Sequence, residues 1–120
     1  MPLTDFTLTE FLTARFDEDE AKIDGDWSDG YDLHIISEAM RNRMLAEIAA
    51  KRRIVSLFEE ERGRRDIYNR DYDSGEYDFN ENDLRARLAS NAHCRGLEEA
   101  TLAHVQPYAD HPDFREEWRA

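Results

Sequence analysis

Metal-binding side chains gather in the last third of the sequence, at His93, Cys94, His104 and His111. Imidazole and thiolate are the donors that zinc prefers, and a structural zinc site needs four of them around one ion. No two of these residues lie two to four positions apart, and neighbours such as His93 and Cys94 point in different directions on a helix. We therefore expect no metal and no other cofactor, with Cys94 packing as a small apolar side chain.

Carboxylates could also support chemistry, either as calcium ligands or as an acid and base pair. Residues 24–29 and 71–75 resemble the start of a calcium-binding loop, but both lack its glycine at the sixth position and its glutamate at the twelfth. The sequence has no glycine-rich phosphate loop and no serine in a nucleophile elbow. It therefore favours a protein without catalysis, and leaves an active site assembled from distant residues as the alternative.

The charge of the chain restricts the classes of partner that it can bind. Its 120 residues include 28 Asp and Glu and 16 Lys and Arg, which gives a formal net charge of -12. Nucleic-acid binding draws its affinity from Lys and Arg at phosphates, so we expect no direct DNA or RNA binding. Residues 1–20 lack the basic stretch and the continuous apolar segment of a secretion signal, and no later apolar run reaches the roughly 18 residues that cross a bilayer. We expect a single acidic domain, residues 1–120, in the cytoplasm and away from membranes.

The charges are unevenly distributed along the chain. Residues 1–34 carry a net charge of -8, residues 35–70 carry +3, and residues 71–83 carry -6. The middle segment is a basic island, and fourteen of the sixteen basic residues are arginine, which pairs with carboxylates through two hydrogen bonds. We expect internal charge pairing that holds two helices antiparallel, between the acids Asp17, Glu18, Asp19 and Glu20 and the bases Lys51, Arg52 and Arg53.

Helices must position these side chains, because apolar residues recur at helical spacing over long stretches. Thr7 and Glu10 have the spacing of a capping box, which predicts that the first helix begins at Thr7. The second helix is predicted from about Ile36 to about Glu61. Gly63 follows as its natural stop, because glycine readily takes the left-handed conformation that ends helices.

Residues 66–82 combine aromatic side chains with Asp, Asn, Ser and Gly. This composition predicts an ordered acidic and aromatic loop, since aromatic side chains rarely remain fully solvated. A short β-hairpin about Ser74 and Gly75 is an alternative prediction for part of this loop.

An asparagine, Asn80 or Asn82, is expected to cap a third helix after this loop. Gly96 either separates it from a fourth helix or only kinks it. Phe114 and Trp118, four residues apart in a last short turn, are expected to close the core. The predicted fold class is mainly α, a small bundle of about four helices.

Three segments together resemble a family of small proteins of unknown function from actinobacteria and their phages. They read FLTARFDEDE at 11–20, RMLAEIAAKRRIV at 43–55 and PYADHPDFREEWR at 107–119, and they cover about a third of the chain. The resemblance implies a phage or actinobacterial origin. The family has no assigned activity that could be transferred to this chain.

Two kinds of function fit these observations. In the first, the chain is a phage-encoded or phage-derived acidic protein that binds a host protein or forms a homodimer. The most specific version of this hypothesis is an inhibitor or a DNA mimic. In the second, it is a small-ligand or metal-binding domain, with or without catalysis, around Trp27, His34 and the PYADHP segment. The expected partner surface consists of acidic turns and their tyrosines, namely Asp26, Asp29, Asp71, Tyr72, Asp73, Glu76, Tyr77 and Asp78.

Overall fold

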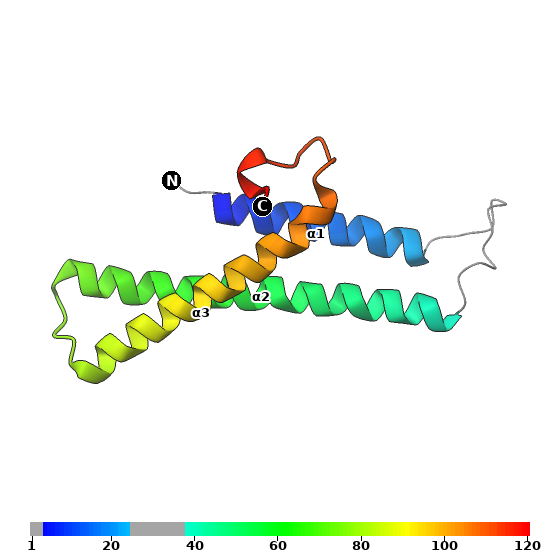
Figure 1. Cartoon of the computed structure of the whole chain (residues 1–120). Coiled ribbons are helices and arrows are strands. Elements are labelled where there is room, and N and C mark those ends of the chain that lie inside the picture. Colours follow the sequence, from blue (N-terminus) through cyan, green and yellow to red (C-terminus); the bar gives the residue numbers. More distant parts are fainter. Residues whose placement is uncertain (1–3, 25–37) are drawn as a thin grey trace.

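The computed structural model describes residues 4–24 and 38–120, which form three long α-helices followed by two 3-10 turns. Helix α1 (Thr4–Asp24) and helix α2 (Glu38–Ser74) run in opposite directions, and α3 (Glu81–Val105) crosses α2 and ends against α1 (Figure 1). The turns η2 (Gln106–Tyr108) and η3 (Glu116–Trp118) complete the chain. The prediction of a mainly α fold is confirmed, while the count of about four helices is wrong.

The core lies where α1 meets α2 and the C-terminal segment. Leu8, Leu12 and Phe16 recur every four residues on α1 and are almost fully buried, so one face of this helix points inward. From the facing elements the same cluster includes Ile48, Val55, Val105 and Trp118.

The ends of α1 and α2 differ from the predicted ends. Thr7 lies inside α1, which begins at Thr4, so Thr7 is not an N-cap. Helix α2 begins at Glu38 and continues through Gly63 to Ser74. A glycine inside a helix costs only about 1 kcal/mol relative to alanine, which packing against a neighbouring helix can offset. The glycine that ends α2 is Gly75, whose φ of +71° is left-handed.

The predicted loop and hairpin at 66–82 are also corrected by the structure. Residues up to Ser74 belong to α2, only 75–80 form a connection, and the described residues contain no strand. Asn80 is the cap of α3, since its side chain accepts from the Asp83 amide and the Asp83 carboxylate accepts from the Asn80 amide. The two helices predicted on either side of Gly96 are one continuous helix.

The molecule is elongated, with extents of 66 × 29 × 20 Å. The end of α2 and the beginning of α3 project beyond α1 (Figure 1). We call this projecting part, residues 62–90, the arm. None of the described helices has an apolar stretch long enough to cross a membrane.

Candidate functional site

Arg52 joins α2 to the acidic end of α1. Its Nη2 donates to Asp17 Oδ1 at 2.6 Å and to Glu20 Oε1 at 2.7 Å. Desolvation lowers the pKa of Arg52, but the hydrogen bonds to both carboxylates outweigh it and raise that pKa. Arg53, the next residue, is exposed, so of these two arginines Arg52 forms the bridge.

The two acids between Asp17 and Glu20 have other partners. Glu18 accepts from Arg15 Nη2 at 2.9 Å, on its own helix. Asp19 Oδ2 accepts from the hydroxyl of Tyr108 at 2.5 Å, which ties α1 to the C-terminal segment. Burial and this neighbouring carboxylate raise the pKa of the Tyr108 hydroxyl. Lys51 and Asp19 both line another hollow between α1 and α2.

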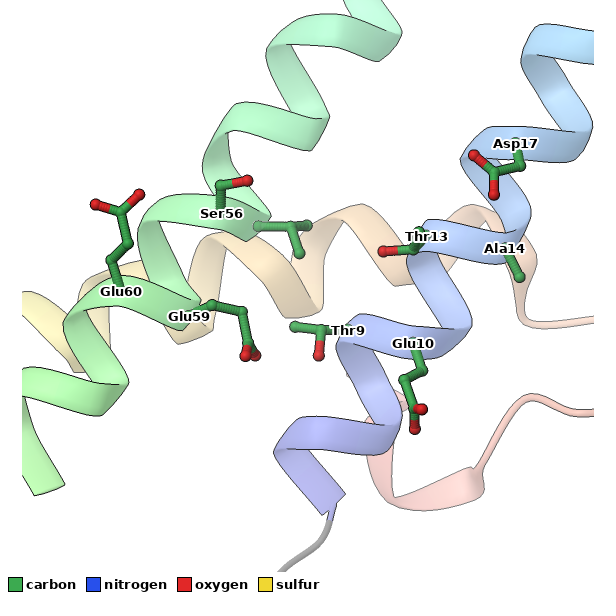
Figure 2. A pocket seen from close by; sticks show the side chains of 9 residues that line it. Thr9, Glu10, Thr13, Ala14, Asp17, Ser56, Glu59 and Glu60 are labelled. Atoms are coloured by element: carbon green, nitrogen blue, oxygen red, sulfur yellow. The ribbon is translucent and has the colours of Figure 1, made fainter.

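An open groove of about 660 Å³ separates the N-terminal part of α1 from the middle of α2. Figure 2 shows that residues of α1 form one wall and residues of α2 the other. We call it the acidic groove, because four carboxylates and three hydroxyls line it. Its lining residues are Thr9, Glu10, Thr13, Ala14, Asp17, Val55, Ser56, Glu59 and Glu60.

Two of these four carboxylates already have arginine partners. Asp17 is held by Arg52, and Glu59 accepts two hydrogen bonds from Arg62 at 2.9 and 3.1 Å. No ion pair joins Glu10 or Glu60 to another residue in the described parts of the chain, so they supply the remaining negative charge. The groove therefore attracts a cationic group such as a lysine side chain and repels anions. Sequence reasoning missed this feature, because it depends on how α1 crosses α2.

Glu61, on the opposite side of α2, is buried against α3 with 4% of its surface exposed. It accepts from Ser90 Oγ at 2.5 Å, from His93 Nδ1 at 3.1 Å and from Arg64. Serine, histidine and glutamate are the residue types of a hydrolase triad, but here the serine hydroxyl bonds the carboxylate rather than the imidazole. The arrangement holds α3 on α2, and within the described residues Ser90 lacks the hydrogen bond to an imidazole that a triad serine makes.

The other metal candidates do not form a site with His93. Cys94 is fully buried inside α3, and His104 is half-buried further along that helix, where burial and then Lys51 lower its pKa. His111 Nδ1 accepts from the Asp113 amide at 3.0 Å. Within 4–24 and 38–120, no three histidine, cysteine or acidic side chains are grouped so that they could hold a metal ion.

The predicted partner-binding residues that the structure describes surround the end of the arm. We call residues 71–79 the tip. Tyr72 packs edge-on against Phe79 at 5.6 Å between ring centroids, and the Arg87 guanidinium lies 4.1 Å from the Tyr72 ring centroid. Tyr77 is 58% exposed. The acidic side chains around them are the half-buried Asp71 and the exposed Asp73, Glu76 and Asp78.

The remaining sequence predictions lie outside the described residues. They concern the partner-binding candidates Asp26 and Asp29 and the ligand-site candidates Trp27 and His34.

The fold and these surfaces define a small, acidic, mainly helical protein. Residues 6–120 match the model of a family of unknown function, DUF6221, and the chain belongs to that family. The match is consistent with the resemblance to an uncharacterised family. No curated protein and no solved structure matches the chain.

Proposed function

We propose that this chain is a non-catalytic protein-binding protein whose contact surface is the end of the arm. One observation carries the proposal. Of the six large hydrophobic residues that are exposed in the described parts of the chain, five lie between positions 67 and 88. They are Ile67, Tyr72, Tyr77, Leu84 and Leu88.

This composition suits a protein interface better than a solvated helix end. Tyrosine is enriched in interfaces because it presents a large, rigid surface with a polar tip. At the tip, two exposed tyrosines stand among carboxylates, which favours a partner whose apolar pocket has a basic rim. The acidic groove, on the α1 side of α2, would add to the attraction for such a surface.

The proposal extends to the origin and the partner. The sequence motifs support a protein encoded by a phage or derived from one, which binds an actinobacterial host protein in the host cytoplasm. An inhibitor is the simplest consequence of such binding. In a DNA mimic, carboxylates rather than tyrosines would dominate the affinity, and binding would weaken steeply as salt rises.

Affinity capture with matched variants tests the proposal. The wild type is compared with Tyr77→Ala/Leu88→Ala at the arm and with Met40→Ala, which removes a similarly exposed side chain at 50% exposure near the start of α2. We expect wild type and Met40→Ala to enrich the same actinobacterial protein, and the double variant to lose it. Equal capture by all three, or no enriched protein, would reject the arm as the contact surface.

A small-ligand site at the C-terminal segment is a second candidate function. Two buried hydrogen-bond donors without an acceptor in the described parts of the chain favour it. Arg15 Nε and Trp118 Nε1 are buried and have no acceptor among the described residues. Both residues line a hollow of about 540 Å³ beside Phe11 and Arg115, and the carboxylates of Glu10 and Asp113 belong to the same lining. An aromatic carboxylate has the ring and the acceptors that such a lining would take.

Titration with benzoate, followed by the amide and indole signals in NMR spectra, tests this second candidate. A saturable shift of the Trp118 indole signal, absent with benzylamine, would support it. Equal shifts of the two indole signals, or no shift, would reject it.

A further inference from the structure

We propose that a hollow between α2 and α3, at the base of the arm, binds a multiply charged oxyanion of the phosphate class. The hollow has a volume of about 370 Å³ and lies away from the acidic groove. Three arginines, two asparagines and one glutamate line it. They are Arg65 and Asn69 of α2 with Arg87, Asn91, Arg95 and Glu98 of α3.

The charge of this hollow is opposite to that of the whole chain. Three arginines line it, and Glu98 is the one carboxylate of its lining. Arg65 also pairs with Asp66 at 3.0 Å, so the positive charge of the hollow comes mainly from Arg87 and Arg95. Three arginines that line one hollow repel one another, even in a chain of net charge -12. An anion bound between them would reduce this repulsion.

The hydrogen-bond donors of the hollow are partly held in position. Arg87 Nε donates to Asn69 Oδ1 at 3.0 Å, and its guanidinium lies against the Tyr72 ring. Asn69 Nδ2 in turn donates to Asn91 Oδ1 at 3.2 Å. These contacts leave the Nη groups of Arg87 and the amide nitrogen of Asn91 available to a ligand. Fixed donors bind an oxyanion with less loss of side-chain entropy.

Arg95 completes the set from the solvent side. It is exposed, and no hydrogen bond or ion pair joins it to another residue within 4–24 or 38–120. An arginine fork can give two parallel hydrogen bonds to one oxyanion. Arg95 can therefore close over a bound anion without giving up an existing contact.

The size of the hollow indicates more than a lone ion. Small-molecule pockets usually start at about 300 Å³. A phosphate ester of a small molecule or a free polyphosphate would supply the same acceptors. The acidic surface of the chain disfavours a phosphate that belongs to a nucleic acid.

Calorimetric titration with inorganic pyrophosphate at constant ionic strength tests the proposal. Three proteins are compared: the wild type, Arg95→Gln, and the control Arg85→Gln. Arg85 is an exposed arginine of the same helix that pairs with Glu81 outside the hollow. We expect saturable one-to-one binding by wild type and Arg85→Gln, and about tenfold weaker binding by Arg95→Gln, the loss of roughly one charged hydrogen bond.

Two results would overturn the proposal. One is the absence of saturable binding by the wild type. The other is equal weakening by Arg85→Gln and Arg95→Gln, which would mean that pyrophosphate only screens surface charge. Because Arg95 makes no contact that stabilises the fold, its variant should melt at the wild-type temperature. A second titration, with inorganic phosphate, distinguishes the sources. If phosphate binds as tightly as pyrophosphate, the ligand is a free phosphate ion; if pyrophosphate binds and phosphate does not, the ligand is a diphosphate or its ester.

Discussion

Glu61 carries a negative charge between two helices. Its hydrogen-bond and charge partners determine whether this buried carboxylate stabilises the fold. Burial alone would raise the pKa of its carboxyl group, because water no longer stabilises the charge. The hydrogen bond from Ser90 and the charges of Arg64 and His93 outweigh burial, so the pKa is lowered from its usual value of 4.5. The sequence could not reveal this role, since it depends on contact with α3, whose Ser90 is 29 residues further along the chain.

A lowered pKa makes this carboxylate a source of stability that acid removes. The contribution is fully present above the unfolded-state pKa near 4.5 and is lost as the pH falls through the lower folded-state value. We expect Glu61→Gln to flatten the dependence of the unfolding free energy on pH below about 5. Urea unfolding at a series of pH values from neutral to acidic measures this dependence. Glu99→Gln, an exposed change on α3, should leave the slope unchanged; a slope unaltered in Glu61→Gln would contradict the assignment.

Neighbouring arginines on α2 provide a second test at the scale of single residues. Arg52 bonds two carboxylates of α1, whereas Arg53 is exposed. Exposed ion pairs contribute about 0.2–1 kcal/mol each, and reversing the charge adds repulsion. We expect Arg52→Glu to lower the unfolding free energy by roughly 1–2 kcal/mol. The control Arg53→Glu should change it by less than about 0.5 kcal/mol. Equal effects in thermal unfolding would show that Arg52 does not join the helices.

At the scale of elements, the helices could be predicted but their ends could not. The apolar stripe of α1 has the helical period, and its burial follows from that pattern. Gly63 and Gly96 have the residue type of a helix stop, yet both α2 and α3 pass through them. Their helices are stabilised by packing between α2 and α3, which includes the Glu61 contacts, and no local pattern contains that information.

The two glycines of α2 should respond to alanine in opposite ways. At Gly63 a Cβ would meet nothing within 4 Å, and the backbone is helical, so Gly63→Ala should stabilise by about 0.5–1 kcal/mol. At Gly75 the space is also open, but the φ of +71° is unfavourable for alanine. Gly75→Ala should therefore destabilise by about 1 kcal/mol. Urea unfolding of both variants measures this, and a stabilised Gly75→Ala would show that α2 ends in another way.

The shape of the whole molecule determines how its core is closed. The radius of gyration is 19.0 Å, against about 14 Å for a compact chain of this length. An elongated shape buries less apolar surface, so the core must be closed by segments that are distant in sequence. The C-terminal segment does this by returning over α1. Its aromatic residues could be identified from the sequence, but their target on α1 depends on the path of α3.

Trp118 is the side chain on which this closure depends. It is 2% exposed, and its ring centroid lies 5.1 Å from that of Phe11 and 5.6 Å from that of Phe114. We expect Trp118→Ala to destabilise the protein by about 3–5 kcal/mol, because it leaves a cavity at the meeting point of α1 and the C-terminal segment. The control Leu88→Ala, at a residue of the arm that is 61% exposed, should change the stability by less than about 0.5 kcal/mol. Urea unfolding followed by circular dichroism measures both. If Trp118→Ala were no worse than the control, the helices would form the core alone, and the C-terminal segment would be only a covering that a ligand or a partner could displace.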